Sequence, residues 1–103
     1  MATPVRATDE QITTAIKSLR AALDFLEVEL PPRLKNENKK RLVRARRILI
    51  IKEFDTSEKL HGLADALLWS IDLIPENYAG PVPAEIGEAF RVLHAWGYVS
   101  PQA

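Results

Sequence analysis

Apolar residues recur at three- and four-residue intervals between Asp9 and Glu29, the spacing that places them on one face of an α-helix. Thr8 and Gln11 have the spacing of a capping box, in which two side chains satisfy free backbone amides at the start of a helix. Pro31 and Pro32 lack the amide hydrogen that would continue the helix. The pattern therefore predicts a first helix over Asp9–Glu29.

A second helix is predicted from Asn36 to Glu53, and its apolar positions form two rows. One row suits a core: Leu34, Leu42, Ala45, Ile48 and Leu49. The other row lies about a third of a turn away and consists of Val43, Ile50 and Phe54. Basic residues flank this second row, with Lys39 and Arg46 on one side and Lys40, Arg44 and Arg47 on the other. The apolar run 48–51, which is rich in β-branched isoleucine, is expected to be helical because no partner strand is evident.

Two further helices are predicted, from Ser57 to Ile74 and from Ala84 to Trp96. Thr56 is among the candidate N-caps of the third helix, and its leucines recur at helical spacing. Residues 75–83 hold three prolines and a glycine, so we expect an extended loop there. Gly97 occupies the position of a left-handed cap at the end of the fourth helix.

These elements predict an all-α fold, a small single-domain bundle of about four helices with the proline-rich loop between helices three and four. The single domain covers residues 1–103, with a loose N-terminal arm over residues 1–7. Short connections favour antiparallel neighbours among the first three helices. The expected core contains Ile16, Leu19, Leu23, Leu49, Leu63, Leu67, Ile71, Phe90 and Leu93.

Charge is distributed unevenly along the 103 residues. Fourteen Lys and Arg balance fourteen Asp and Glu, yet nine of the fourteen cations lie within residues 33–54, against two carboxylates. The chain contains no cysteine, which excludes disulfides and thiolate sites. No apolar run approaches the roughly 20 residues of a membrane span, and the first residues do not resemble a signal peptide. We therefore expect a cytoplasmic protein that does not enter a membrane.

No pattern in the sequence indicates an enzyme, a cofactor or a metal site. Glu58 and His61 have the spacing of one half of a carboxylate-bridged metal site, but the second copy and two further glutamates are missing. Residues 85–99 superficially suggest a recognition helix and wing, but the long preceding loop does not fit the short turn of a helix-turn-helix. The expectation is a non-enzymatic protein without cofactors.

The basic second helix leaves two functional hypotheses. The first is a protein-interaction module (adaptor, inhibitor or assembly subunit) that binds an acidic protein surface or its own copy, as a homo-oligomer. The second is a nucleic-acid-binding protein that lays the same cations along phosphates. Alternatively, the cations are only solvated, or are paired with carboxylates of the same chain. The predicted binding residues are Lys39, Lys40, Val43, Arg44, Arg46, Arg47, Ile50 and Phe54.

Overall fold

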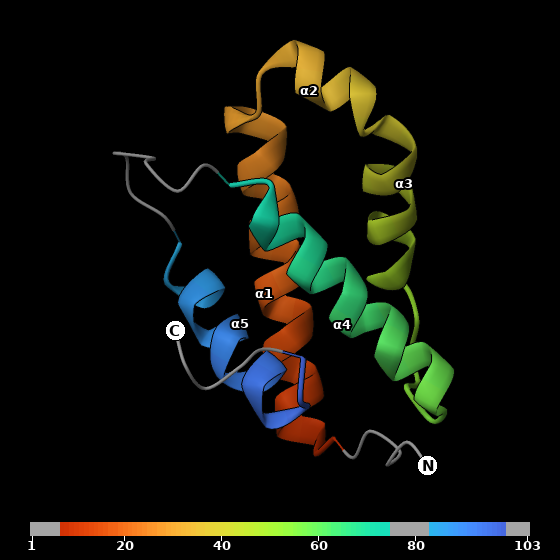
Figure 1. The fold of residues 1–103 in the computed structure, drawn as a ribbon. Helices are drawn as coiled ribbons and strands as arrows, with labels where there is room; N and C mark the ends of the chain where they lie inside the picture. The colour runs from red at the N-terminus through yellow and green to blue at the C-terminus, as the bar shows by residue number, and fades with distance from the viewer. Residues whose placement is uncertain (1–6, 75–82, 99–103) are drawn as a thin grey trace.

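The computed structural model describes residues 7–74 and 83–98, and every regular element within these ranges is an α-helix. The predicted fold class is confirmed at that level, as a small all-helical fold (Figure 1). The expected loop at 75–82 and most of the expected arm, residues 1–6, lie outside the described residues. The described helices are α1 (Asp9–Glu29), α2 (Pro32–Glu37), α3 (Lys39–Ile48), α4 (Ser57–Asp72) and α5 (Ala84–Ala95).

Helix α1 is the element against which the others are arranged. It packs most extensively on α5 and then on α4, whereas α3 packs lightly on both α4 and α1. Figure 1 shows α5 on one side of α1, α4 crossing it and α3 on the other side, with α2 joining the ends of α1 and α3. Helices α1 and α3 run in opposite directions, as do α3 and α4, which agrees with the predicted antiparallel arrangement.

Hydrogen bonds fasten α5 to α1 at two places along their contact. The buried Ser18 hydroxyl lies 2.7 Å from the carbonyl oxygen of Glu85 and 2.8 Å from that of Thr14, so its one proton is shared between them. Near the start of α1, the indole Nε1–H of Trp96 donates to Gln11 Oε1 over 3.0 Å. The close contact between the helices excludes water from these polar groups, and the bonds provide the hydrogen-bond partners that water would otherwise supply.

The predicted caps of the first and last helices are confirmed. Thr8 and Gln11 form the full capping box at the start of α1, which begins at Asp9. Gly97 follows α5 with a φ of 81°, a conformation that glycine adopts at little cost. The amide of Tyr98 then donates to the carbonyl oxygen of Leu93 over 2.9 Å, which completes a Schellman motif.

The prediction of one continuous helix from Asn36 to Glu53 is wrong at both ends and in the middle. Helix α2 already begins at Pro32, because the first helical position needs no amide donor. Asn38 then interrupts the helix, with a φ of −108° and a ψ of 12°, and its side-chain amide donates to the carbonyl of Leu34. Since Asn38 ends α2 and precedes α3, the chain changes direction there.

Helix α3 ends at Ile48, so the predicted helix over residues 49–53 is also wrong. The amides of Leu49, Ile50 and Ile51 bond to carbonyls three residues earlier, as in a tightening last turn. β-branched side chains crowd the preceding helical turn, which disfavours continuation through this run. The described residues contain no strand here, in agreement with the expectation that the run would not pair as one.

Most of the predicted core is confirmed, with one error. Leu19, Leu23, Leu63, Leu67, Ile71 and Leu93 are buried, and Ile16 and Leu49 are half-buried against the same core. Phe90 was expected in the core but is 44% exposed. Helix α5 turns Ala89 inward instead, because a small side chain lets helices approach more closely than a phenylalanine would.

This difference in burial gives a stability prediction for α5. Leu93→Ala should lower the free energy of unfolding by about 2–5 kcal/mol, because it leaves a cavity in the core. Phe90→Ala should lower it by less than Leu93→Ala does, because Phe90 is 44% exposed and its truncation leaves no enclosed cavity. Urea denaturation of both variants measures the two values, and an equal loss would show that Phe90 is a core residue after all.

The start of α4 gives a prediction for pH. Lys59 Nζ lies 2.8 Å from Asp55 Oδ1, and this hydrogen bond lowers the pKa of Asp55 and raises the pKa of Lys59. The stabilisation from Asp55 is therefore present above its unfolded pKa and is lost as the pH falls through the lowered folded value. In Lys59→Gln, an NMR titration should find the pKa of Asp55 closer to the ordinary 3.8. An unchanged pKa would contradict the assignment, and Lys17→Gln is the control.

Candidate functional site

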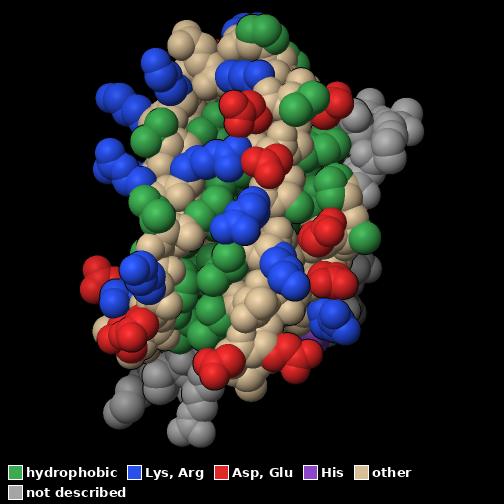
Figure 2. All heavy atoms as spheres, turned by 180° about the vertical axis from the view of Figure 1, so that it is seen from behind, with side chains coloured by type: hydrophobic (Ala, Val, Ile, Leu, Met, Phe, Trp, Pro, Cys, Tyr) green, Lys and Arg blue, Asp and Glu red, His purple; other side chains and the backbone are tan. Residues whose placement is uncertain are grey.

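Helix α3 has a buried side and a solvent-exposed side. Ala45 is buried, and Leu42, Ile48 and Leu49 are half-buried against the core. The opposite side is exposed and carries Lys39, Lys40, Val43, Arg44 and Arg47. Figure 2 shows the resulting surface from behind, with Lys and Arg side chains along the edge over α3 and single hydrophobic side chains between them. Five of the eight predicted binding residues therefore lie together on one accessible face.

The other three predicted binding residues are placed differently. Ile50 is 75% exposed, but it lies in the turn after α3. Phe54 lies beyond this turn and is half-buried against the core, beside Ile12 and Ile16 of α1. The structure thus separates Phe54 from the exposed row that it was expected to continue, because α3 ends before it.

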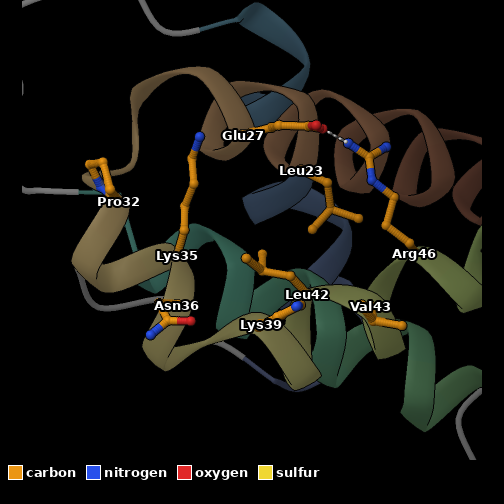
Figure 3. Close-up of a pocket in the computed structure, with 9 residues that line it drawn as sticks. All are labelled: Leu23, Glu27, Pro32, Lys35, Asn36, Lys39, Leu42, Val43 and Arg46. Atoms are coloured by element: carbon orange, nitrogen blue, oxygen red, sulfur yellow. Dashed lines mark hydrogen bonds and ion pairs between the residues drawn. The ribbon is translucent and has the colours of Figure 1, made fainter.

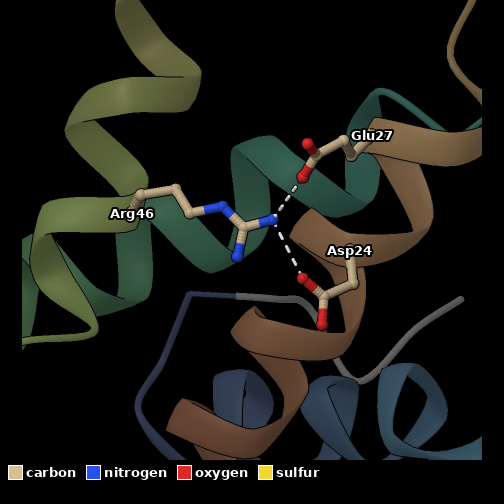
Figure 4. Close-up of polar contacts among 3 residues, drawn as sticks. All are labelled: Asp24, Glu27 and Arg46. Carbon is tan, nitrogen blue, oxygen red and sulfur yellow. Dashed lines mark hydrogen bonds and ion pairs between the residues drawn. The ribbon is translucent and has the colours of Figure 1, made fainter.

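Arg46, the last of the eight, is held by two carboxylates of α1. Its Nη2 donates to Asp24 Oδ1 and to Glu27 Oε2, both over 2.9 Å (Figure 4). The last turn of α1 contains no basic residue, so Arg46 supplies a cation at the end of the helix where the backbone dipole favours one. Pairing within the same chain, weighed above for all the cations, is therefore found for Arg46.

The exposed cations of α3 have no such partners. Within residues 7–74 and 83–98, Lys39, Lys40, Arg44 and Arg47 form no ion pair; the pairs found there are those of Arg46, Arg33 with Glu37, and Lys59 with Asp55. Arg41, on the other edge of α3, lies over the ring of Trp69 at 5.8 Å. The uncompensated positive charge is thus concentrated on the outer side of α3.

A groove runs beside this face, between α3 and the end of α1. Leu23 and Leu42 point toward one another in its floor, and Val43 lies on the α3 side (Figure 3). Lys35 and Asn36 of α2 lie at one end, while Arg46 lines the groove farther along α3. The groove has a volume of about 540 Å³ and is lined by Leu23, Glu27, Pro32, Lys35, Asn36, Lys39, Leu42, Val43 and Arg46.

Sequence reasoning found three of these lining residues, Lys39, Val43 and Arg46, and missed the others as site residues. Leu23 was assigned to the core, and it is indeed only 2% exposed. Lys35 was placed before the second helix, whereas α2 brings it to the groove because Asn38 turns the chain. Lys35 belongs to the basic stretch 33–54, so its charge was noted from the sequence. Its place beside the groove could not be predicted, because it depends on the turn at Asn38.

The remaining candidate chemistry is sparse. In the described ranges, no three His, Asp or Glu side chains gather as metal ligands would. The ring of His61 lies against that of Tyr98, with centroids 5.6 Å apart. None of the described helices is both long and apolar enough to cross a bilayer.

No protein-family model, curated protein or solved structure matches this chain. The α3 face and its groove are the features of the described residues that indicate a function.

The placement of Phe54 and Val43 predicts different behaviour for two apolar truncations. Phe54→Ala should lower the free energy of unfolding by about 2 kcal/mol or more, because the ring packs against the core. Val43→Ala should change it by less than about 1 kcal/mol, because the side chain is 47% exposed. Thermal unfolding followed by circular dichroism distinguishes them, and a larger loss from Val43→Ala would contradict this division.

Proposed function

We propose that this protein is a non-enzymatic protein-interaction module that binds an acidic protein surface through helix α3. The single observation that carries the proposal is a group of exposed cations around the exposed Val43; Lys39, Lys40, Arg44 and Arg47 form no ion pair with any described residue. Four cations held on one rigid helix repel one another, and carboxylates of a partner relieve that repulsion. Arginine is well suited to this role, because its planar guanidinium bonds carboxylates at two points.

The exposed apolar side chains favour a protein partner over a nucleic acid. Val43 and Ile50, 47% and 75% exposed, offer apolar contact of the kind found at the centre of protein interfaces. Phosphates would gain nothing from these apolar side chains. The cationic row itself is equally suited to phosphate, so nucleic-acid binding is the competing outcome of the test below.

Charge also favours an acidic partner over a second copy of this face. The face carries the cations Lys39, Lys40, Arg44 and Arg47, and α3 contains no carboxylate to offset them. Two such faces brought together would place positive charge against positive charge. An acidic surface of a different protein avoids this cost.

The test is a double charge reversal with a matched control. Arg44→Glu/Arg47→Glu should weaken binding of a glutamate-rich peptide at least about tenfold, because two attractive contacts become repulsive. Lys17→Glu/Arg20→Glu reverses the same number of exposed charges at the same spacing on α1 and should leave binding nearly unchanged. Fluorescence anisotropy over a salt series measures the affinities, and circular dichroism checks that each variant is folded.

Three outcomes would contradict the proposal. Unchanged binding in Arg44→Glu/Arg47→Glu would mean that the row is merely solvated. Equal losses in both double variants would mean that only total charge matters. Tighter binding of a DNA duplex than of the peptide, with a steep loss of affinity as salt rises, would replace the proposal by nucleic-acid binding.

A further inference from the structure

We propose that the groove between α1, α2 and α3 receives the apolar edge of an acidic amphipathic helix from the partner. This inference rests on the proposed function and names the kind of segment that the α3 face binds. The partner helix would place apolar side chains over Leu23 and Leu42, and its flanking carboxylates would lie near Lys35 and Lys39.

A groove remains between α1 and α3 because the two helices pack only lightly on one another, and leucines make its floor apolar. Leu23 and Leu42 meet there, and Val43 adds a wall that is 47% exposed. The volume of about 540 Å³ lies within the roughly 300–1,000 Å³ of binding pockets. Two helices with a gap along their contact provide the surface into which an amphipathic helix lays its apolar face.

The rim of the groove selects for negative charge. Lys35 and Lys39 line it from α2 and α3, and among the described residues neither has a carboxylate partner. Glu27, the acidic residue that lines the groove, is already bonded to Arg46 (Figure 3). A helix with glutamates beside its apolar edge therefore matches both the floor and the rim, whereas a neutral apolar helix would leave the lysines without partners.

Arg46 adds a second element of selectivity at the groove. Asp24 and Glu27 both bond to Nη2, and within the described part of the chain Nη1 has no bonding partner, so it can bond a partner carboxylate (Figure 4). The two α1 carboxylates also compete with that partner for the guanidinium. Asp24→Asn/Glu27→Gln should accordingly tighten binding of an acidic helix, whereas a groove that binds through apolar contact alone would show no change.

The experiment compares two synthetic helices of equal charge, about four turns long. One carries leucines along a single edge flanked by glutamates, and the other has glutamine in place of each leucine, because the two residues have similar helix propensity. The protein should bind the leucine helix at least about tenfold more tightly, since only that helix buries apolar surface in the groove.

A pair of matched valine variants tests whether the preference for the leucine helix arises in the groove. Val43→Thr keeps the side-chain shape but makes the groove wall polar, so the preference for the leucine helix should fall several-fold. Val28→Thr makes the same change at a 78% exposed valine of α1 that does not line the groove, and the preference should persist. Melting temperatures verify that both variants are folded.

The outcomes separate this inference from the proposed function. If wild-type protein binds both helices equally, the groove inference is overturned and binding to an acidic surface stands. The inference also fails if Val43→Thr leaves the preference intact or if Val28→Thr removes it equally. If neither helix binds, the groove inference and the proposed function fail together.

Discussion

The burial of one face of α1 is the constraint on which the rest of the structure depends. Ala15, Leu19, Ala22, Leu23 and Leu26 are all nearly inaccessible, and α5 and α4 provide most of the helix contact. In a chain of 103 residues the surface that can be buried is limited, so this contact has to supply much of the core. The hydrogen bonds of Ser18 and Trp96 then fix α5 against α1.

Helix α3 packs on the parts of α1 and α4 that the contact between these two helices leaves uncovered. Ala45 is its one buried residue, and Arg46 reaches across to α1 from a partly exposed position. Exposed ion pairs contribute typically less than about 1 kcal/mol each, so this link orients α3 more than it stabilises the fold. The weak packing has two consequences: a groove remains beside α1, and the basic side of α3 stays in water. The fold thereby presents charge and apolar surface together.

The parts of the fold that were predictable from sequence are those set by local chemistry. The capping box at Thr8 and the left-handed Gly97 depend on residues adjacent in the chain, and both were found as expected. The break at Asn38 was missed because asparagine also occurs inside helices, and a side-chain bond to the carbonyl oxygen four residues earlier does not by itself mark the end of a helix. Phe90 was misplaced because helical spacing alone did not show which of two neighbouring residues would face α1.

The candidate site was predictable in composition but not in shape. Charge clustering identified Lys40, Arg44 and Arg47 correctly as an accessible row, since Lys and Arg side chains are seldom buried in a core. The groove could not be foreseen, because it joins Leu23 to Lys35 and Val43 across three helices. Arg46 was expected to face a partner, whereas its pairing with Asp24 depends on how α3 lies along α1.

The central claim is that the partner binds on α3 and the groove beside it, and a chemical-shift map tests it most directly. Backbone amide spectra would be recorded while the leucine-bearing acidic helix is added to the protein. If the partner binds there, the largest shifts fall in α2, α3 and the last two turns of α1. Shifts concentrated on α4 and α5, around the exposed Phe90, would contradict it.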